Sequence, residues 1–110
     1  MKTEDFIQNI VQPRLELCKE LLGGSKDKEY SRNGDKFHNF KRTAELRKIS
    51  TIAAWDGMQN KHLTSLLDII DDAKKGILPT QKTLDDKITD MINYLLLLEG
   101  IITEKRNDLS

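Results

Sequence analysis

The sequence predicts an all-α protein, a small helical bundle of about four helices that is completed by oligomerisation. Three observations predict it: only two prolines in 110 residues, 5% aromatic residues, and long runs of Leu, Ile, Lys, Asp and Glu. Apolar residues make up 37% of the chain, so the core is thin for its length and self-association is favoured. A chain of this length forms one domain, and we assign residues 1–110 to it.

The first expected helix covers residues 3–22. Its apolar positions at helical spacing are Phe6, Ile10, Leu17 and Leu21. Gly23 and Gly24 mark its end. Pro13 removes one backbone hydrogen bond, so we expect the helix to bend or restart there. The stretch GGSKDKEYSRNGD, residues 23–35, is typical of a loop.

The next two helices are marked by capping residues. Asp35 is expected to cap a short second helix, and Ser50 a longer third helix that runs to about residue 75. The inward residues of the short helix are expected to be Phe37, Phe40 and Ala44. Gly76 and Pro79 mark a turn before the fourth helix.

The fourth expected helix, residues 81–106, has the clearest apolar pattern. Six apolar residues follow alternating steps of four and three, as in a bundle seam: Leu84, Ile88, Met91, Leu95, Leu98 and Ile102. The run YLLLL at residues 94–98 makes this helix apolar on nearly every side for more than one turn. We therefore expect a homo-oligomer that covers the apolar surface.

The charge balance, the cysteine content and the N-terminus exclude some classes of partner and indicate the cellular compartment. Eighteen basic residues balance eighteen acidic ones, so the chain has no net field to hold polymeric nucleic acid. Cys18 is the single cysteine and forms no intramolecular disulfide. The N-terminus has acids before any apolar run, and no stretch approaches the ~18 apolar residues of a membrane span. We expect a cytoplasmic protein with no membrane contact.

Two polar stripes at i, i+4 and i+7 form the first candidate site. Lys61, Ser65 and Asp68 make the stripe on the third helix, and Asp86, Asp90 and Asn93 the stripe on the fourth. If these helices pack antiparallel, the three carboxylates of Asp68, Asp86 and Asp90 converge and could bind Mg²⁺, which prefers oxygen ligands. Lys61 would then contact a phosphate. Ordinary solvent-exposed faces explain the same spacing.

For two further residues, His62 and Asn93, the sequence indicates a position near the interior. His62 falls on an apolar stripe with Trp55, Leu66 and Ile69, which suits a hydrogen-bonded core histidine better than a catalytic base. Asn93 directly precedes the YLLLL run, so we expect it near the interior, where a side-chain amide needs hydrogen bonds.

The segment before the second helix is the second candidate site. Its candidate ligand-binding residues are Tyr30, Arg32, Asp35, Lys36 and His38. The cations of this segment would hold phosphates and an aromatic ring would stack on a base. The alternative is a charged surface loop followed by a helix.

Three stretches together resemble a known family. EYSRNGDKFHNFKR, then GMQNKHL and SLLDII, then DDKITDMINYLLLLEG look like small phage-encoded MazG-like proteins, related to nucleotide modification associated domains. The resemblance covers roughly residues 28–100 and is most recognisable at Lys61, His62 and the Asp86-Lys87-x-x-Asp90-x-x-Asn93-Tyr94 pattern. The wider superfamily is similar to all-α nucleoside triphosphate pyrophosphohydrolases, which assemble as dimers or tetramers.

The resemblance implies a single MazG-like domain in residues 1–110, in the host cytoplasm if phage-encoded. By position, Asp68, Asp86 and Asp90 would bind magnesium, Asn93 would orient a ligand, and Lys61 would contact phosphate. The superfamily's Glu-x-x-Glu motif is missing from this chain, which favours a nucleotide pocket over turnover.

Three functions remain open at this point. The first is nucleotide binding, with possible magnesium-dependent hydrolysis of a nucleoside triphosphate to monophosphate and pyrophosphate. The second is a non-catalytic sponge that sequesters nucleotide immune signals, such as a cyclic nucleotide or an ADP-ribose derivative, in anti-defence. The third is a helical adaptor that uses the YLLLL surface to meet a partner helix.

Overall fold

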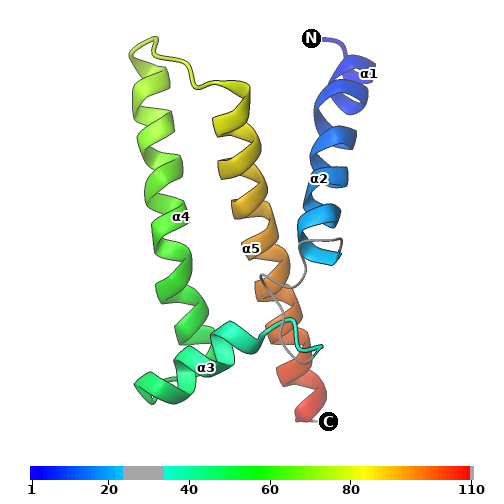
Figure 1. Cartoon of the computed structure of the whole chain (residues 1–110). Coiled ribbons are helices and arrows are strands. Elements are labelled where there is room, and N and C mark those ends of the chain that lie inside the picture. The colour runs from blue at the N-terminus through cyan, green and yellow to red at the C-terminus, as the bar shows by residue number, and fades with distance from the viewer. Residues whose placement is uncertain (24–33, 110) are drawn as a thin grey trace.

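The computed structural model describes residues 1–23 and 34–109, and every regular element in these ranges is helical (Figure 1). In chain order the elements are α1 (Thr3–Phe6), the π-helical turn η1 (Ile7–Val11), α2 (Gln12–Gly23), α3 (His38–Arg47), α4 (Thr51–Lys74) and α5 (Gln81–Asp108). The predicted all-α class is confirmed. No helix in the described part of the chain is long and apolar enough to span a bilayer.

The long helices form an open layer with α5 in the middle. α4 runs antiparallel to α5 on one side, as expected from their short connection, and α2 lies on the other side (Figure 1). Among the described helices, α2 packs against α5 and not against α4. The short helix α3 crosses one end of the layer and packs against α4.

Of the two predicted caps, Ser50 is confirmed and Asp35 is not. The Ser50 hydroxyl oxygen accepts a hydrogen bond from the Ala53 N–H at 3.0 Å and caps α4. Thr80 caps α5 in the same way, through the Thr83 N–H at 3.2 Å. Asp35 does not cap α3 directly, because α3 begins at His38; its carboxylate instead accepts from the Phe37 N–H in the preceding turn.

The expected irregularity at Pro13 takes the form of the π turn η1. Pro13 has no N–H to donate to the carbonyl of Asn9, and its ring crowds that carbonyl. The turn just before it widens to π spacing, so α1, η1 and α2 continue as one rod instead of restarting as a separate helix (Figure 1).

The core lies where α3 crosses α4 and α5. Its buried apolar members are Phe40, Trp55, Leu97 and Ile101. Phe40 and Ala44 are buried, as predicted, and Phe37 is half-buried. The Trp55 Nε1–H donates to the Tyr94 carbonyl oxygen at 2.8 Å, which fixes the register of α4 against α5.

The most buried line of α5 is not the predicted seam. It runs through Thr89, Asn93, Leu97 and Ile101, in steps of four. The seam residues remain half-buried, except Leu95, which is 53% exposed. In the folded chain, α5 has α2 and α4 on its two sides and α3 near its end. The line of residues between these neighbours is covered, whereas no described helix lies over the seam. The spacing of apolar residues within α5 does not reveal these neighbours, so the prediction chose the wrong line. Within YLLLL, Leu97 is thus a core residue, whereas Leu95 and Leu96 lie at the surface.

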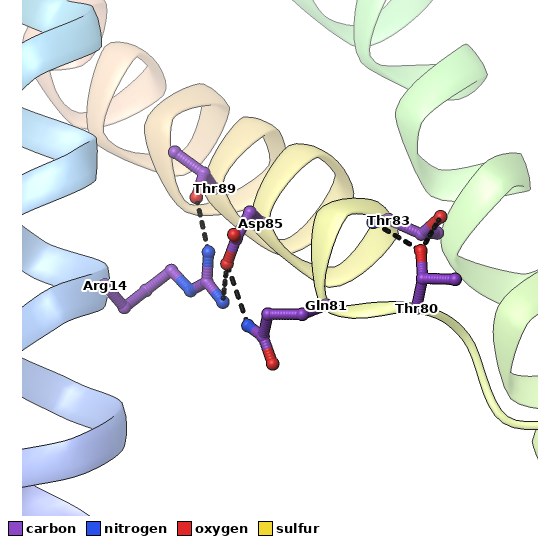
Figure 2. Close-up of polar contacts among 6 residues, drawn as sticks. All are labelled: Arg14, Thr80, Gln81, Thr83, Asp85 and Thr89. Carbon is purple, nitrogen blue, oxygen red and sulfur yellow. Dashed lines mark hydrogen bonds and ion pairs between the residues drawn. The ribbon is translucent and has the colours of Figure 1, made fainter.

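Arg14 joins α2 to α5 through the polar contacts drawn in Figure 2. Its guanidinium donates to the Thr89 hydroxyl at 3.0 Å and lies 3.0 Å from an Asp85 carboxylate oxygen. Gln81 also donates to Asp85, and this hydrogen bond, followed by Arg14, lowers the pKa of Asp85. Thr89 is fully buried, so losing its donor would leave a buried hydroxyl with one hydrogen bond fewer, a change that costs ~1–3 kcal/mol when the group is left unsatisfied.

Candidate functional site

The two predicted polar stripes lie on one face of the α4–α5 hairpin. The α3 segment packs on the sides of α4 and α5 that carry Ala54 and Gly100: Ala54 lines a hollow shared with α3, and the Phe37 ring rests on Gly100. At about 100° per residue, each stripe falls on this same side of its helix. We call the six stripe residues the front face: Lys61, Ser65 and Asp68 on α4, and Asp86, Asp90 and Asn93 on α5.

At the front face the two helices meet through His62 and Asp90. The His62 Nδ1 lies 3.7 Å from an Asp90 carboxylate oxygen, and the two side chains are 23% and 29% exposed. The imidazole also packs on Tyr94, with 4.4 Å between the ring centroids. His62 therefore points inward, as predicted, but at 3.7 Å it makes an ion pair when protonated and not a hydrogen bond.

Asp90 sits in surroundings that disfavour its negative charge. Burial raises the pKa of its carboxyl group, and the charge of Asp86 adds to the rise, whereas His62 and Lys87 oppose it. A half-buried carboxylate of this kind is stabilised by any cation or N–H donor that approaches it. Asp90 is thus the acid of the front face best suited to contact a ligand.

Asn93 has the interior position that the sequence predicted. It is 6% exposed, and its side-chain oxygen has no hydrogen-bond partner among the described residues. Leaving such an acceptor unsatisfied costs about 1–3 kcal/mol. Asn93 lies three residues after Asp90 on α5, so both side chains project from the same side of the helix. Its amide oxygen is thus an unused acceptor beneath the front face.

The other stripe residues do not complete a metal site: three of them are exposed and Ser65 is half-buried. Lys61 and Asp68 are exposed on α4, and Asp86 accepts from Lys82 at 3.0 Å, with the Asp86 side chain 56% exposed. Asp68 lies six residues beyond His62, about 9 Å further along the helix axis, so the register that pairs His62 with Asp90 carries Asp68 away from them. Among the described residues, no three His, Cys, Asp or Glu side chains are grouped as metal ligands would be. The three predicted carboxylates are therefore not gathered, and magnesium binding stays a prediction.

The candidates before α3 take part mainly in contacts within the chain. Asp35 accepts from Lys41 at 3.0 Å as well as from the Phe37 N–H, which is the main cause that lowers its pKa. The Lys36 ammonium donates to the Leu22 carbonyl at the end of α2. His38 is half-buried as the first residue of α3. Tyr30 and Arg32 lie outside the described residues.

Comparison with known proteins adds no relative. No protein-family model, no curated protein and no solved structure matches the chain. The resemblance to MazG-like proteins therefore stays a prediction. Sequence reasoning missed Arg14, whose contacts with Asp85 and Thr89 span more than 70 residues and leave no local pattern.

Proposed function

We propose that the protein binds a phosphorylated nucleotide on the front face, around Lys61, His62, Asp90 and Asn93. The observation that carries the proposal is the buried side-chain oxygen of Asn93, without a described partner, on the same side of α5 as the His62–Asp90 pair. A ligand that supplies an N–H donor to this oxygen would remove the cost of leaving it unsatisfied.

The chemistry of these groups fits a nucleotide better than an ion alone. Lys61 provides positive charge for a phosphate, and the His62 imidazole provides an N–H donor. Asn93 provides an acceptor for an N–H of a base, and the Asp90 carboxylate lies 3.7 Å from the His62 imidazole. The ligand class that suits them has an anionic end and an end rich in N–H groups.

Binding without turnover is the form of the proposal that the geometry supports. Phosphoryl chemistry of the predicted kind depends on carboxylates gathered around magnesium. Of the three predicted ligands, Asp90 alone lies beside His62, while Asp86 pairs with Lys82 and Asp68 lies further along α4. We therefore expect the ligand to be released intact.

A thermal-shift screen tests the proposal. Nucleoside triphosphates, nucleoside monophosphates, cyclic dinucleotides and ADP-ribose are added with and without magnesium, and at least one class should raise the apparent Tm. A ligand at 100 times its Kd stabilises the folded state by ~2.7 kcal/mol. Lys61→Ala should reduce the shift, whereas the matched control Lys74→Ala, an exposed lysine outside the front face of the same helix, should not.

Asn93→Leu gives a sharper result, because two effects should have opposite directions. Removing the unsatisfied amide should leave the ligand-free protein at least as stable as wild type, while the ligand-induced shift is lost. No shift with any nucleotide, or an unchanged shift in Asn93→Leu, contradicts the proposal. Pyrophosphate released in the magnesium arm would show hydrolysis in place of simple binding.

A further inference from the structure

We infer that the hollow between α3 and α4 binds a small amphiphile with an apolar body and one carboxylate, such as a free fatty acid of medium length. The hollow lies where α3 meets the start of α4 (Figure 1), and its volume is about 620 Å³. Small-molecule sites usually have volumes of ~300–1,000 Å³. None of the residues that line the hollow belongs to the front face, so the inference does not depend on the proposed nucleotide site.

The α4 wall of the hollow is apolar and consists mostly of small residues. Ala53, Ala54 and Gly57 line it, and a Cβ added at Gly57 would meet no atom within 4 Å. Met58 completes this wall with a flexible thioether, which adapts to the shape of an apolar ligand. The surface of α4 therefore leaves space for an apolar chain.

The opposite wall exposes two large apolar side chains to solvent. Leu46, on α3, is 71% exposed, and Ile49, just after α3, is 42% exposed. Single apolar residues on a surface are ordinary, but these two border a hollow of ligand size. An apolar chain between them and Gly57 would remove this surface from water, which is favourable in proportion to the area covered.

Arg47 supplies the charge that recognises the ligand. Of the described residues that line the hollow, it alone is ionised. No acidic side chain in the described part of the chain forms an ion pair with it. The planar guanidinium matches a carboxylate with two parallel N–H donors, so a carboxylate is the anion that suits this position.

The charges near the end of α3 also favour an anionic ligand. Arg42, Arg47 and Lys48 are accompanied by one acid, Glu45. Glu45 is two residues after Thr43, which lines the hollow, so it lies about 200° round the helix from that side. The chain as a whole has no net charge, and this local excess of positive charge attracts an anion.

The length of the hollow favours a single small molecule over a partner helix. Its lining residues on α4 run only from 53 to 58, which is about 7.5 Å along the helix axis. A helix docked in a groove uses anchor residues as far apart as i and i+7, roughly 10 Å along its axis. The α4 wall is shorter than that distance.

Calorimetric titration of the full chain with decanoate, kept below the concentration at which it forms micelles, tests the inference. We expect saturable binding of one decanoate per chain. Decyltrimethylammonium has the same alkyl chain and the opposite charge, and it should bind at least about tenfold more weakly.

Two arginine variants test the role of Arg47. Arg47→Ala should weaken decanoate binding about tenfold, as expected for the loss of a charge-assisted hydrogen bond. The matched control Arg42→Ala removes the same charge from the same helix outside the lining of the hollow. Its effect should be much smaller, because salt screens an exposed charge that does not contact the ligand.

Gly57→Leu tests the hollow separately from the charge. The leucine side chain fills the hollow from α4 and replaces a glycine within a helix, so the variant should be at least as stable as wild type while decanoate binding is lost. The absence of saturable decanoate binding overturns the inference. So does equal binding of the two amphiphiles of opposite charge, or decanoate binding that neither Arg47→Ala nor Gly57→Leu weakens.

Discussion

Replacing Trp55 by alanine is expected to lower the free energy of unfolding by about 3–5 kcal/mol, the usual cost of removing a buried tryptophan. Trp55 is 8% exposed and packs with Phe40, Leu97 and Ile101 in the main core cluster. Few other apolar side chains are buried in the described part of the chain, so the rest of the core cannot make up for the loss. Urea unfolding at fixed protein concentration, followed by far-ultraviolet circular dichroism, measures the change.

Trp55→Phe separates packing from hydrogen bonding at the same position. It keeps an aromatic ring but loses the hydrogen bond to the Tyr94 carbonyl, so we expect a smaller loss than for alanine, about 1–2 kcal/mol. Equal losses for the two variants, or a loss below 1 kcal/mol for Trp55→Ala, would show that the core does not lie where α3 crosses the hairpin.

Alanine at the two helical glycines Gly57 and Gly100 is expected to have opposite effects. Gly57 lies in α4 with open space where a Cβ would stand, so Gly57→Ala should stabilise the protein by about 1 kcal/mol through helix propensity. At Gly100 an added Cβ would lie 2.6 Å from the Phe37 ring, so Gly100→Ala should be destabilising by about 1–2 kcal/mol despite the same propensity gain. Paired urea titrations compare the two variants.

A double mutant shows whether Phe37 causes the difference. In a Phe37→Ala background the obstruction is gone, and Gly100→Ala should then stabilise by about 1 kcal/mol, as Gly57→Ala does. If Gly100→Ala stays destabilising without the Phe37 ring, the close contact between residues 37 and 100 does not determine the packing of α3 on α5.

Local signals predicted most of the fold. Ser50 caps α4 as predicted, and the apolar spacing placed Phe40 and Ala44 inward, because these features depend on residues within one or two turns. The predicted seam of α5 was not its buried line, since helical spacing identifies an apolar side but not the neighbours that cover it.

The sequence predicted which side of each helix carries the candidate site, but not how far α4 is shifted along α5. Spacing alone placed the two polar stripes, and the structure puts them on one side of the hairpin. Long-range contacts, such as the hydrogen bond from Trp55 to Tyr94, set the position of α4 along the axis of α5. In this position Asp90 lies beside His62, and Asp68 lies further along α4. Arg14 was out of reach for the same reason, because its partners on α5 are fixed by tertiary packing.

The central claim is that a phosphorylated nucleotide binds at the front face, and a nuclear magnetic resonance titration tests it most directly. Uniformly ¹⁵N-labelled protein is titrated with the nucleotide that gives the largest thermal shift. We predict that amide shifts concentrate at Lys61, His62, Asp90, Asn93 and Tyr94, and that the side-chain amide of Asn93 shifts with them. Shifts confined to residues outside the front face, or none at millimolar nucleotide, would contradict the proposed binding site.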